Sequence, residues 1–396
     1  MIINTRRIVD HLLLLMTIAI SGFPFFSSTI LLIPLFVILS FVFLLRKRGL
    51  DVIFVWSLLL LLVITASQSL IFNFFSLQTS AGVFLRLING YLIIKILRDN
   101  FAIFYVNILF MLSLISLLFF IPIISIPGFD NFLIDLAPFF QIANISGFDG
   151  DSLILYTLRD LTSSRNAGPF WEAGAFGGYL IVAFIFNKFT KSSNKKIKEL
   201  IILIAILSTL SSTAYFVIFF FLFIFYFRHI KNFFLKISII ILLVCFGYFA
   251  AFNLSFLSEK VIDQASIAAE VNDPYLDTGN TQRFLNILRD YEDFKGYEVF
   301  GRGSNPQTRY SFDPENQIRT VGLTDIIVRM GIPYFIFMMF LMHRSFRHFT
   351  NFYGYNGKLY YNSIFFSIIL ILLSQVYFNF PVFWSFLFLS CAYKKT

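Results

Sequence analysis

Long apolar runs are the feature that most constrains how this chain can fold. Many of them reach the ~20 residues that a helix needs to cross a bilayer, and 56 phenylalanines lengthen them. Only 13% of the residues are charged, against roughly 25% in soluble domains. The chain is therefore predicted to be an all-α polytopic membrane protein. We expect about 12 transmembrane helices, at residues 8–25, 28–45, 51–71, 79–97, 101–122, 172–187, 198–211, 213–227, 232–256, 321–342, 360–378 and 381–393.

Most basic residues fall on one side of these spans. Twenty of the 31 Lys and Arg lie in segments reached after an even number of crossings, counting the N-terminus as zero. Because Lys- and Arg-rich loops stay in the cytoplasm, both termini are predicted to be cytoplasmic. Most Asp and Glu residues lie in two longer segments on the other side. The net charge of +9 is thus explained by loops that anchor the topology, and no nucleic-acid partner is expected.

Five consecutive segments follow from this topology. They are transmembrane helices 1–5 (residues 1–122), a first periplasmic segment (123–171), helices 6–9 (172–256), a second periplasmic segment (257–320) and helices 10–12 (321–396). The first apolar run lacks a small-residue cleavage site, so we expect it to be retained rather than removed as a signal peptide. The exact boundaries of helices 4, 7 and 8 stay open.

The most informative stretch leads from outside into the sixth span. Arg165 and two aromatic residues precede Glu172, and a glycine-rich helix start follows. Arginine suits forked binding of a phosphate, and Trp171 can stack on a sugar ring. A carboxylate at the membrane edge is costly unless it is paired or functional. The alternative is an interfacial aromatic belt in which Arg165 pairs with Glu172 for structural reasons.

The second outer segment is predicted to contain an amphipathic helix. Apolar residues between Phe284 and Phe294 fall mainly on one face, with Arg289, Asp290 and Asp293 elsewhere. Arg283 would lie in its first turn, where a cation is unfavourable next to the helix dipole. That position indicates an anionic partner, or else a simple solvated charge. A Gly-Arg-Gly turn centred on Arg302 follows.

Two arginines lie within predicted spans, where charge is expensive. Arg329 has a simple explanation, because Asp325 stands four residues earlier on the same helix face. Arg86 has none in the sequence. All four histidines fall on the cytoplasmic side, so a site outside would have neither a histidine base nor a histidine-bound metal. Glu172 is then the best placed base.

These features together resemble the bacterial O-antigen and capsule polysaccharide polymerases of the O-antigen polymerase/ligase superfamily. The resemblance covers most of the chain. It rests on the order and spacing of Arg165 to Ala175, Thr278-Gly279 with Arg283, Gly301-Arg302-Gly303, and Gly331 in the tenth span.

The resemblance implies a GT-C-like, inverting, metal-independent glycosyltransferase without cofactors, in the bacterial inner membrane. It would join oligosaccharide repeat units carried on undecaprenyl pyrophosphate at the periplasmic face. By motif match, Arg165 and Arg283 would stabilise the leaving pyrophosphate and Glu172 would be the catalytic base or orient the acceptor. The candidate substrate-binding residues are Arg86, Trp171, Arg302 and Asn316.

Three alternatives stay open. Ligases of the same superfamily usually carry a His-Asn pair where this chain has Thr320-Val321, which favours a polymerase over a ligase-type lipid–sugar transferase. A lipid-linked oligosaccharide flippase would be expected to have shorter outer loops, and a small-molecule transporter would more often show repeated halves. Membrane lipid is an expected partner, and a chain-length regulator protein stays open as another.

Overall fold

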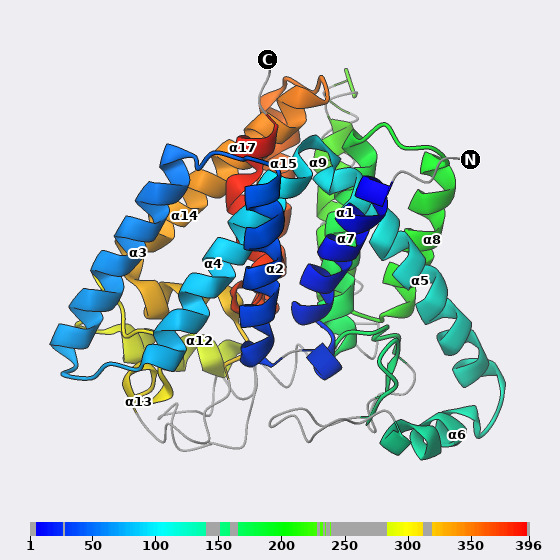
Figure 1. Ribbon diagram of the computed structural model, residues 1–396. Coiled ribbons are helices and arrows are strands. Elements are labelled where there is room, and N and C mark those ends of the chain that lie inside the picture. Colours follow the sequence, from blue (N-terminus) through cyan, green and yellow to red (C-terminus); the bar gives the residue numbers. More distant parts are fainter. Residues whose placement is uncertain are drawn as a thin grey trace.

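The computed structural model describes residues 5–26, 28–139, 151–158, 165–227, 230–232, 234, 238, 283–311 and 319–393. Most of these residues form helices that run between two ends of the molecule (Figure 1). One end, called here the basic end, is where α1 begins and α2 and α4 finish, and it carries Arg6, Arg46 and Arg98. The opposite end carries α6, α12 and α13.

The described residues of the first half form eight α-helices, four 3-10 turns and one hairpin. The helices and short 3-10 turns are α1 (Thr5–Ile20), η1 (Pro24–Phe26), η2 (Thr29–Leu31), α2 (Leu32–Leu45), α3 (Val52–Ile71), α4 (Leu77–Leu97), η3 (Arg98–Asn100), α5 (Phe101–Ser125), α6 (Phe129–Leu136), η4 (Ala137–Phe139), α7 (Ala173–Phe189) and α8 (Lys195–Ser208). The antiparallel hairpin pairs β1 (Asp151–Ser152) with β2 (Thr157–Leu158), with Asp151 opposite Leu158.

The second half adds α9 (Ser212–Phe227), α12 (Arg283–Phe294), α13 (Pro306–Arg309), α14 (Gly322–Phe352), α15 (Lys358–Leu372), η5 (Tyr377–Asn379), α16 (Pro381–Ser385), η6 (Phe386–Phe388) and α17 (Leu389–Ala392). Every predicted span contains one or more of these helices, apart from 232–256, which lies almost entirely outside the described residues. Within the described part of the chain, three helical stretches are long and apolar enough to cross a membrane: Val52–Ile71, Leu77–Ser125 and Gly322–Phe352. The second comprises α4, η3 and α5, and the chain turns back at η3 (Figure 1).

The core of the bundle is built around α7 and the C-terminal segment. Sixteen residues of α7 are buried, as expected for a helix that is apolar on all sides. Its glycines allow neighbours to approach closely, since a Cβ on Gly178 would stand 1.9 Å from the Tyr377 hydroxyl oxygen. The outer helices instead expose large apolar side chains, such as Leu62 on α3 and Leu118 on α5. An apolar outer surface is what a membrane-embedded bundle requires.

The last predicted span, 381–393, differs from a single membrane-crossing helix. It is divided into α16, η6 and α17, and every residue from Pro381 to Tyr393 is buried. At about 1.5 Å per residue, these pieces are too short to cross the ~30 Å of hydrocarbon. The segment therefore fills the middle of the bundle.

A kink in α14 shapes the opposite end. Gly331 has φ +76° and ψ 164°, a conformation open essentially only to glycine, and Pro333 follows it. The residues after α12 dock into this kink. Arg302 N–H donates to the Val328 carbonyl over 2.7 Å, and Ile332 N–H donates to the Glu298 carbonyl over 2.8 Å. The kink thus exchanges hydrogen bonds within α14 for bonds to a loop far from it in sequence.

Candidate functional site

The candidate site surrounds the segment between α15 and α16, residues 373–380, which we call the linker. It lies between the start of α7 and the first half of α14. Polar side chains of the linker reach both helices: Gln375 contacts Glu172, and Asn379 contacts Arg329. A Cβ on Gly322 would stand 2.0 Å from the Gln375 carbonyl oxygen, so the linker backbone lies directly against α14.

Glu172 occupies the N-cap position of α7 in an extended conformation. Its Oε1 accepts a hydrogen bond from Gln375 Nε2. Nearby, the Tyr377 hydroxyl lies 3.2 Å from the Gly174 carbonyl oxygen and 3.3 Å from that of Ala175. The helix start and the linker are therefore fixed to each other, and the carboxylate is oriented by an amide donor.

Trp171 is partly exposed beside Glu172. Its ring centroid lies 4.8 Å from that of Phe380 and 6.3 Å from that of Tyr377. The neighbouring Phe170 is fully buried and packs against Gly22, where a Cβ would stand 2.3 Å from the Phe170 ring. The two aromatics of the motif thus have different surroundings, and only Trp171 has surface left for a ligand.

Arg329 lies on the other side of the linker. Its Nη1 donates to Asp325 Oδ2 over 3.1 Å and to Asn379 Oδ1 over 2.5 Å, and its Nε donates to Ser304 Oγ over 2.9 Å. The predicted pair with Asp325 is confirmed. Arg329 therefore links α14 and the linker to the loop that contains Ser304.

Arg86 on α4 is close enough to Arg329 for the two positive charges to repel each other. Among the described residues it forms no ion pair, and its Nε is buried without a hydrogen-bond acceptor. Its Nη1 lies 3.6 Å from the position of a Cβ on Gly82, so the guanidinium extends back towards the N-terminal end of α4. An arginine in this state suits an anionic ligand.

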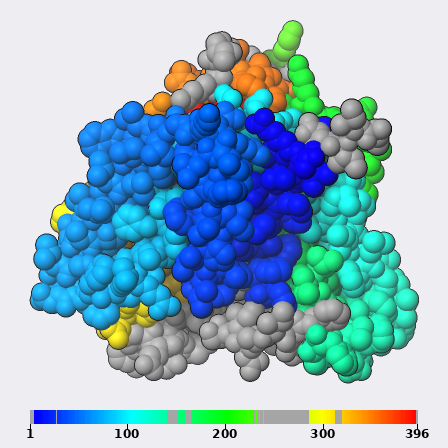
Figure 2. Space-filling view, viewed as in Figure 1, coloured from blue at the N-terminus to red at the C-terminus, as the bar shows by residue number. Residues whose placement is uncertain are grey.

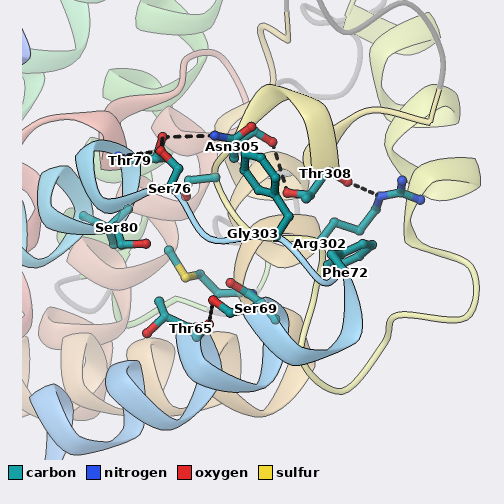
Figure 3. Close-up of a pocket in the computed structure, with 15 residues that line it drawn as sticks. Thr65, Ser69, Phe72, Ser76, Thr79, Ser80, Arg302, Gly303, Asn305 and Thr308 are labelled. Carbon is teal, nitrogen blue, oxygen red and sulfur yellow. Dashed lines mark hydrogen bonds between the residues drawn. The ribbon is translucent and has the colours of Figure 1, made fainter.

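A narrow pocket of about 40 Å³ opens at that end of α4. Figure 3 shows its polar side chains, which come from α3, the start of α4 and the 302–308 loop. Asn305 Nδ2 lies 3.4 Å from Thr79 Oγ1, and Thr308 Oγ1 donates to the Asn305 carbonyl over 3.2 Å. We call this the hydroxyl pocket; its hydroxyl-bearing residues are Thr65, Ser69, Ser76, Thr79, Ser80, Ser304 and Thr308.

Arg302 lines the hydroxyl pocket, but its guanidinium points away from Thr79 and Asn305 (Figure 3). Nε donates to the Thr308 carbonyl over 2.7 Å and Nη1 to the Asp293 carbonyl over 3.2 Å. The guanidinium carbon lies 4.7 Å from the Tyr297 ring centroid. Stacking on Tyr297 and hydrogen bonds to two backbone carbonyls therefore hold the Arg302 side chain against its own loop.

Behind the loop lies a buried network of three arginines and three aspartates, contributed by α12, α13, α14 and the residues just before α14. Arg309 lies 2.5 Å from Asp290, 3.2 Å from Asp293 and 3.1 Å from Asp325. Arg319 lies 3.0 Å from Asp290 and 2.8 Å from Asp293, and Arg329 completes the set. These six side chains, Arg309, Arg319, Arg329, Asp290, Asp293 and Asp325, are called the ion network below.

The ion network corrects the prediction for α12. The helix is where the periodicity predicts it, but Asp290 and Asp293 are fully buried while Tyr291 is 61% exposed. Burial alone would raise the pKa of Asp293, yet hydrogen bonds from Arg319 and the Ser311 N–H, with the charge of Arg309, lower it overall. Paired charges can thus occupy the buried face that a hydropathy pattern assigns to apolar residues.

Three further predicted site residues are Arg165, Arg283 and Asn316. Arg165 Nε donates to the Thr209 carbonyl over 3.2 Å at the C-terminal end of α8. Arg283 begins α12, and its side chain lies outside the description. Asn316 lies outside the described residues.

Neither protein-family models nor curated proteins match this chain.

Three residues of the site were missed by the sequence reasoning. Gln375 and Tyr377 lie at the end of the span predicted at 360–378, and Asn379 lies between it and the span predicted at 381–393. The signal that could have found them is the pair of amides, since Gln375 and Asn379 interrupt an otherwise apolar run just before Pro381. Polar side chains at membrane depth are costly unless they have partners.

Proposed function

We propose that the chain is an O-antigen, capsular or exopolysaccharide polymerase. It joins oligosaccharide repeat units carried on undecaprenyl pyrophosphate at the outer face of the bacterial inner membrane. In this proposal about 12 spans form a GT-C-like fold, the basic end faces the cytoplasm, and the linker faces the periplasm.

The observation that carries the proposal is the state of Arg86. Arg86 lies within an apolar helix, is repelled by the charge of Arg329, and forms no ion pair among the described residues. Such an arginine is costly unless an anion neutralises it. A pyrophosphate is such an anion. The hydroxyl pocket begins one turn away at Val83 and supplies neutral hydrogen-bonding groups of the kind that sugars and phosphates require.

The reaction assigns a role to each group. An acceptor hydroxyl attacks the anomeric carbon of the donor sugar, and the bond from that carbon to the pyrophosphate oxygen breaks. The pyrophosphate leaves with the bonding electrons, and Arg86 and Arg329 stabilise its growing charge. The proton of the hydroxyl passes to the carboxylate of Glu172, which Gln375 holds in place.

Arg165 takes a positioning role here. Its bond to the Thr209 carbonyl ties the start of the 165–172 segment to α8, and so helps to fix the position of Trp171 and Glu172. Arg283 stays a candidate pyrophosphate ligand by its motif match alone.

The test is the surface glycan of a strain that lacks this chain, separated on a gel and complemented with variants. Loss of a polymerase leaves core plus a single repeat unit, whereas loss of a ligase or flippase leaves bare core. Glu172→Gln should slow chain growth about 10²–10⁴-fold, and Arg86→Gln about 10²–10³-fold. Both variants must still reach the membrane.

The matched control is Arg344→Gln, which removes an exposed arginine at the basic end and should leave the ladder of chain lengths unchanged. Bare core in the deletion strain would overturn the polymerase proposal. Normal ladders from both Arg86→Gln and Glu172→Gln would overturn the site assignment.

A further inference from the structure

A second cluster of arginines lies far from the linker, at the basic end. Arg6 and Arg7 come from the start of α1, Arg48 from the turn after α2, and Arg98 from η3. Together they line a cavity of about 330 Å³. The carboxylates of Asp10 and Asp99 also line it, but Asp10 is buried and paired with Arg46. We call this the arginine cavity.

Among the described residues, these four arginines have no acidic partner. None of them forms an ion pair with the described residues, and the Nε of Arg48 is buried without an acceptor. Partial burial lowers the pKa of Arg48, and the positive charges of Arg98, Arg6 and Arg46 lower it further. The cavity thus concentrates positive charge that an anionic group would stabilise.

An apolar groove of about 800 Å³ runs along the same helices towards the opposite end. Ala19, Leu15 and His11 on α1 lie at a spacing of four residues, which continues to Arg7 in the arginine cavity. On α5 the groove is lined by Asn107 and by apolar residues such as Met111. Figure 2 shows α1 (dark blue) beside α5 (teal) on this face of the molecule.

An aromatic contact lies between the arginine cavity and the apolar groove. His11 lines the groove and Phe104 lines the arginine cavity, and their ring centroids are 3.9 Å apart. Met16 and Met111, which line the groove, are 38% and 54% exposed, so the groove opens to the side of the bundle. A charged cavity at the end of an apolar, sideways-open groove matches a molecule with an anionic head and a hydrocarbon chain.

We propose that this seam between α1 and α5 binds one anionic phospholipid, with its phosphate in the arginine cavity and an acyl chain in the apolar groove. Basic pockets between transmembrane helices on the cytoplasmic side are typical sites for anionic head groups, and the basic end is the one predicted to face the cytoplasm. The groove has the size of a ligand site, roughly 300–1,000 Å³. The site does not depend on the proposed polymerase reaction.

The test measures lipid binding to the purified full chain in neutral detergent micelles by native mass spectrometry. Phosphatidylglycerol and phosphatidylcholine with identical acyl chains are compared, together with glycerol phosphate, which carries the charge without the chains. We expect phosphatidylglycerol to bind at least about tenfold more tightly than the other two, since each arginine near an anionic lipid contributes about fivefold.

Two variants and one control locate the site. Arg48→Gln with Arg98→Gln should remove most of the preference for phosphatidylglycerol, while Arg344→Gln with Arg347→Gln, two exposed arginines at the same end, should retain it. Ala19→Trp should fill the groove and weaken both lipids. Should the paired Arg48 and Arg98 variant fail to fold, Arg98→Gln alone gives the same test, because Arg98 is exposed.

Three results would overturn the proposal. Equal binding of the two phospholipids would remove the role of the arginines. Equal binding of glycerol phosphate and phosphatidylglycerol would reduce the cavity to a simple anion site. An unchanged preference in the Arg48 and Arg98 variants would place the lipid elsewhere.

Discussion

The two ends of the bundle treat their charged side chains in different ways. At the basic end, acidic residues form separate pairs, such as Arg46 with Asp10 and Lys95 with Asp51, and several arginines have no described acidic partner. At the opposite end, three arginines and three aspartates join in one buried ion network.

This difference indicates which end of the bundle is the more rigid. A separate ion pair can be removed without disturbing the other pairs. Such pairs therefore contribute little to fixing the relative positions of several helices. In a buried network, removing one charged side chain leaves the others with an uncompensated buried charge. The ion network lies directly behind Arg302 and shares Arg329 with the linker, which places the candidate site on the end of the molecule that is fixed by many connected bonds.

The largest expected effect is the loss of one arginine from the ion network. Arg309→Leu would leave Asp290, Asp293 and Asp325 with fewer cations in a buried place, and should lower the free energy of unfolding by about 3–5 kcal/mol. The measurement is denaturant unfolding of the purified protein in detergent micelles.

The matched variant at the basic end is Lys95→Met. Lys95 Nζ lies 2.8 Å from Asp51 Oδ2, but the Tyr91 hydroxyl also donates to Asp51 over 3.0 Å, so the carboxylate keeps a partner. We expect a loss of about 1 kcal/mol or less. Equal losses of unfolding free energy in Arg309→Leu and Lys95→Met would contradict the claim that the ion network stabilises the protein more than a separate pair does.

Alanine substitution of two glycines compares the backbone at the two ends of the bundle. Gly331 at the opposite end and Gly354 at the basic end both have positive φ, +76° and +87°. A Cβ on Gly331 would stand 2.1 Å from the Val299 carbonyl oxygen, whereas nothing lies within 4 Å of one on Gly354. Gly354→Ala should therefore cost about 1 kcal/mol of strain.

Gly331→Ala should cost more, about 1–3 kcal/mol of strain together with displacement of the docked loop. Unfolding in detergent measures the stability, and limited proteolysis between residues 296 and 305 reports the loop. Protection of that loop in Gly331→Ala equal to that in Gly354→Ala would show that the kink does not hold it.

How far the sequence predicts this molecule depends on the range of the interaction. The helix predicted at 51–71 is α3, Val52–Ile71, because hydropathy and helix formation are local. The bond from Gln375 to Glu172 joins residues 203 positions apart, and no periodicity contains it. The pattern of α12 places Asp290 and Asp293 away from the apolar face, but it does not show that they are buried. Their partners Arg309 and Arg319 lie outside the helix, so no periodicity within it contains them.

The smallest expected effect is the coupling free energy between two charged residues, which a double-mutant cycle measures. Arg319→Leu and Asp293→Asn remove two members of the ion network that lie 2.8 Å apart. They are also connected indirectly, through Asp290 and Arg309, so their free-energy changes should be non-additive by about 0.5–3 kcal/mol. Lys95→Met and Lys188→Met at the basic end have different described partners, Asp51 and Glu199. Their effects should add within about 0.5 kcal/mol.

Both double-mutant cycles use the same unfolding measurement in detergent micelles, so detergent effects are common to the two. Coupling at the opposite end alone is the expected pattern, because Arg309 and Arg319 each contact more than one carboxylate there. Additive behaviour of Arg319→Leu and Asp293→Asn would mean that the ion network acts as independent pairs. In that case the rigidity of the loop behind the linker would have to come from the packing at Gly331 rather than from charge.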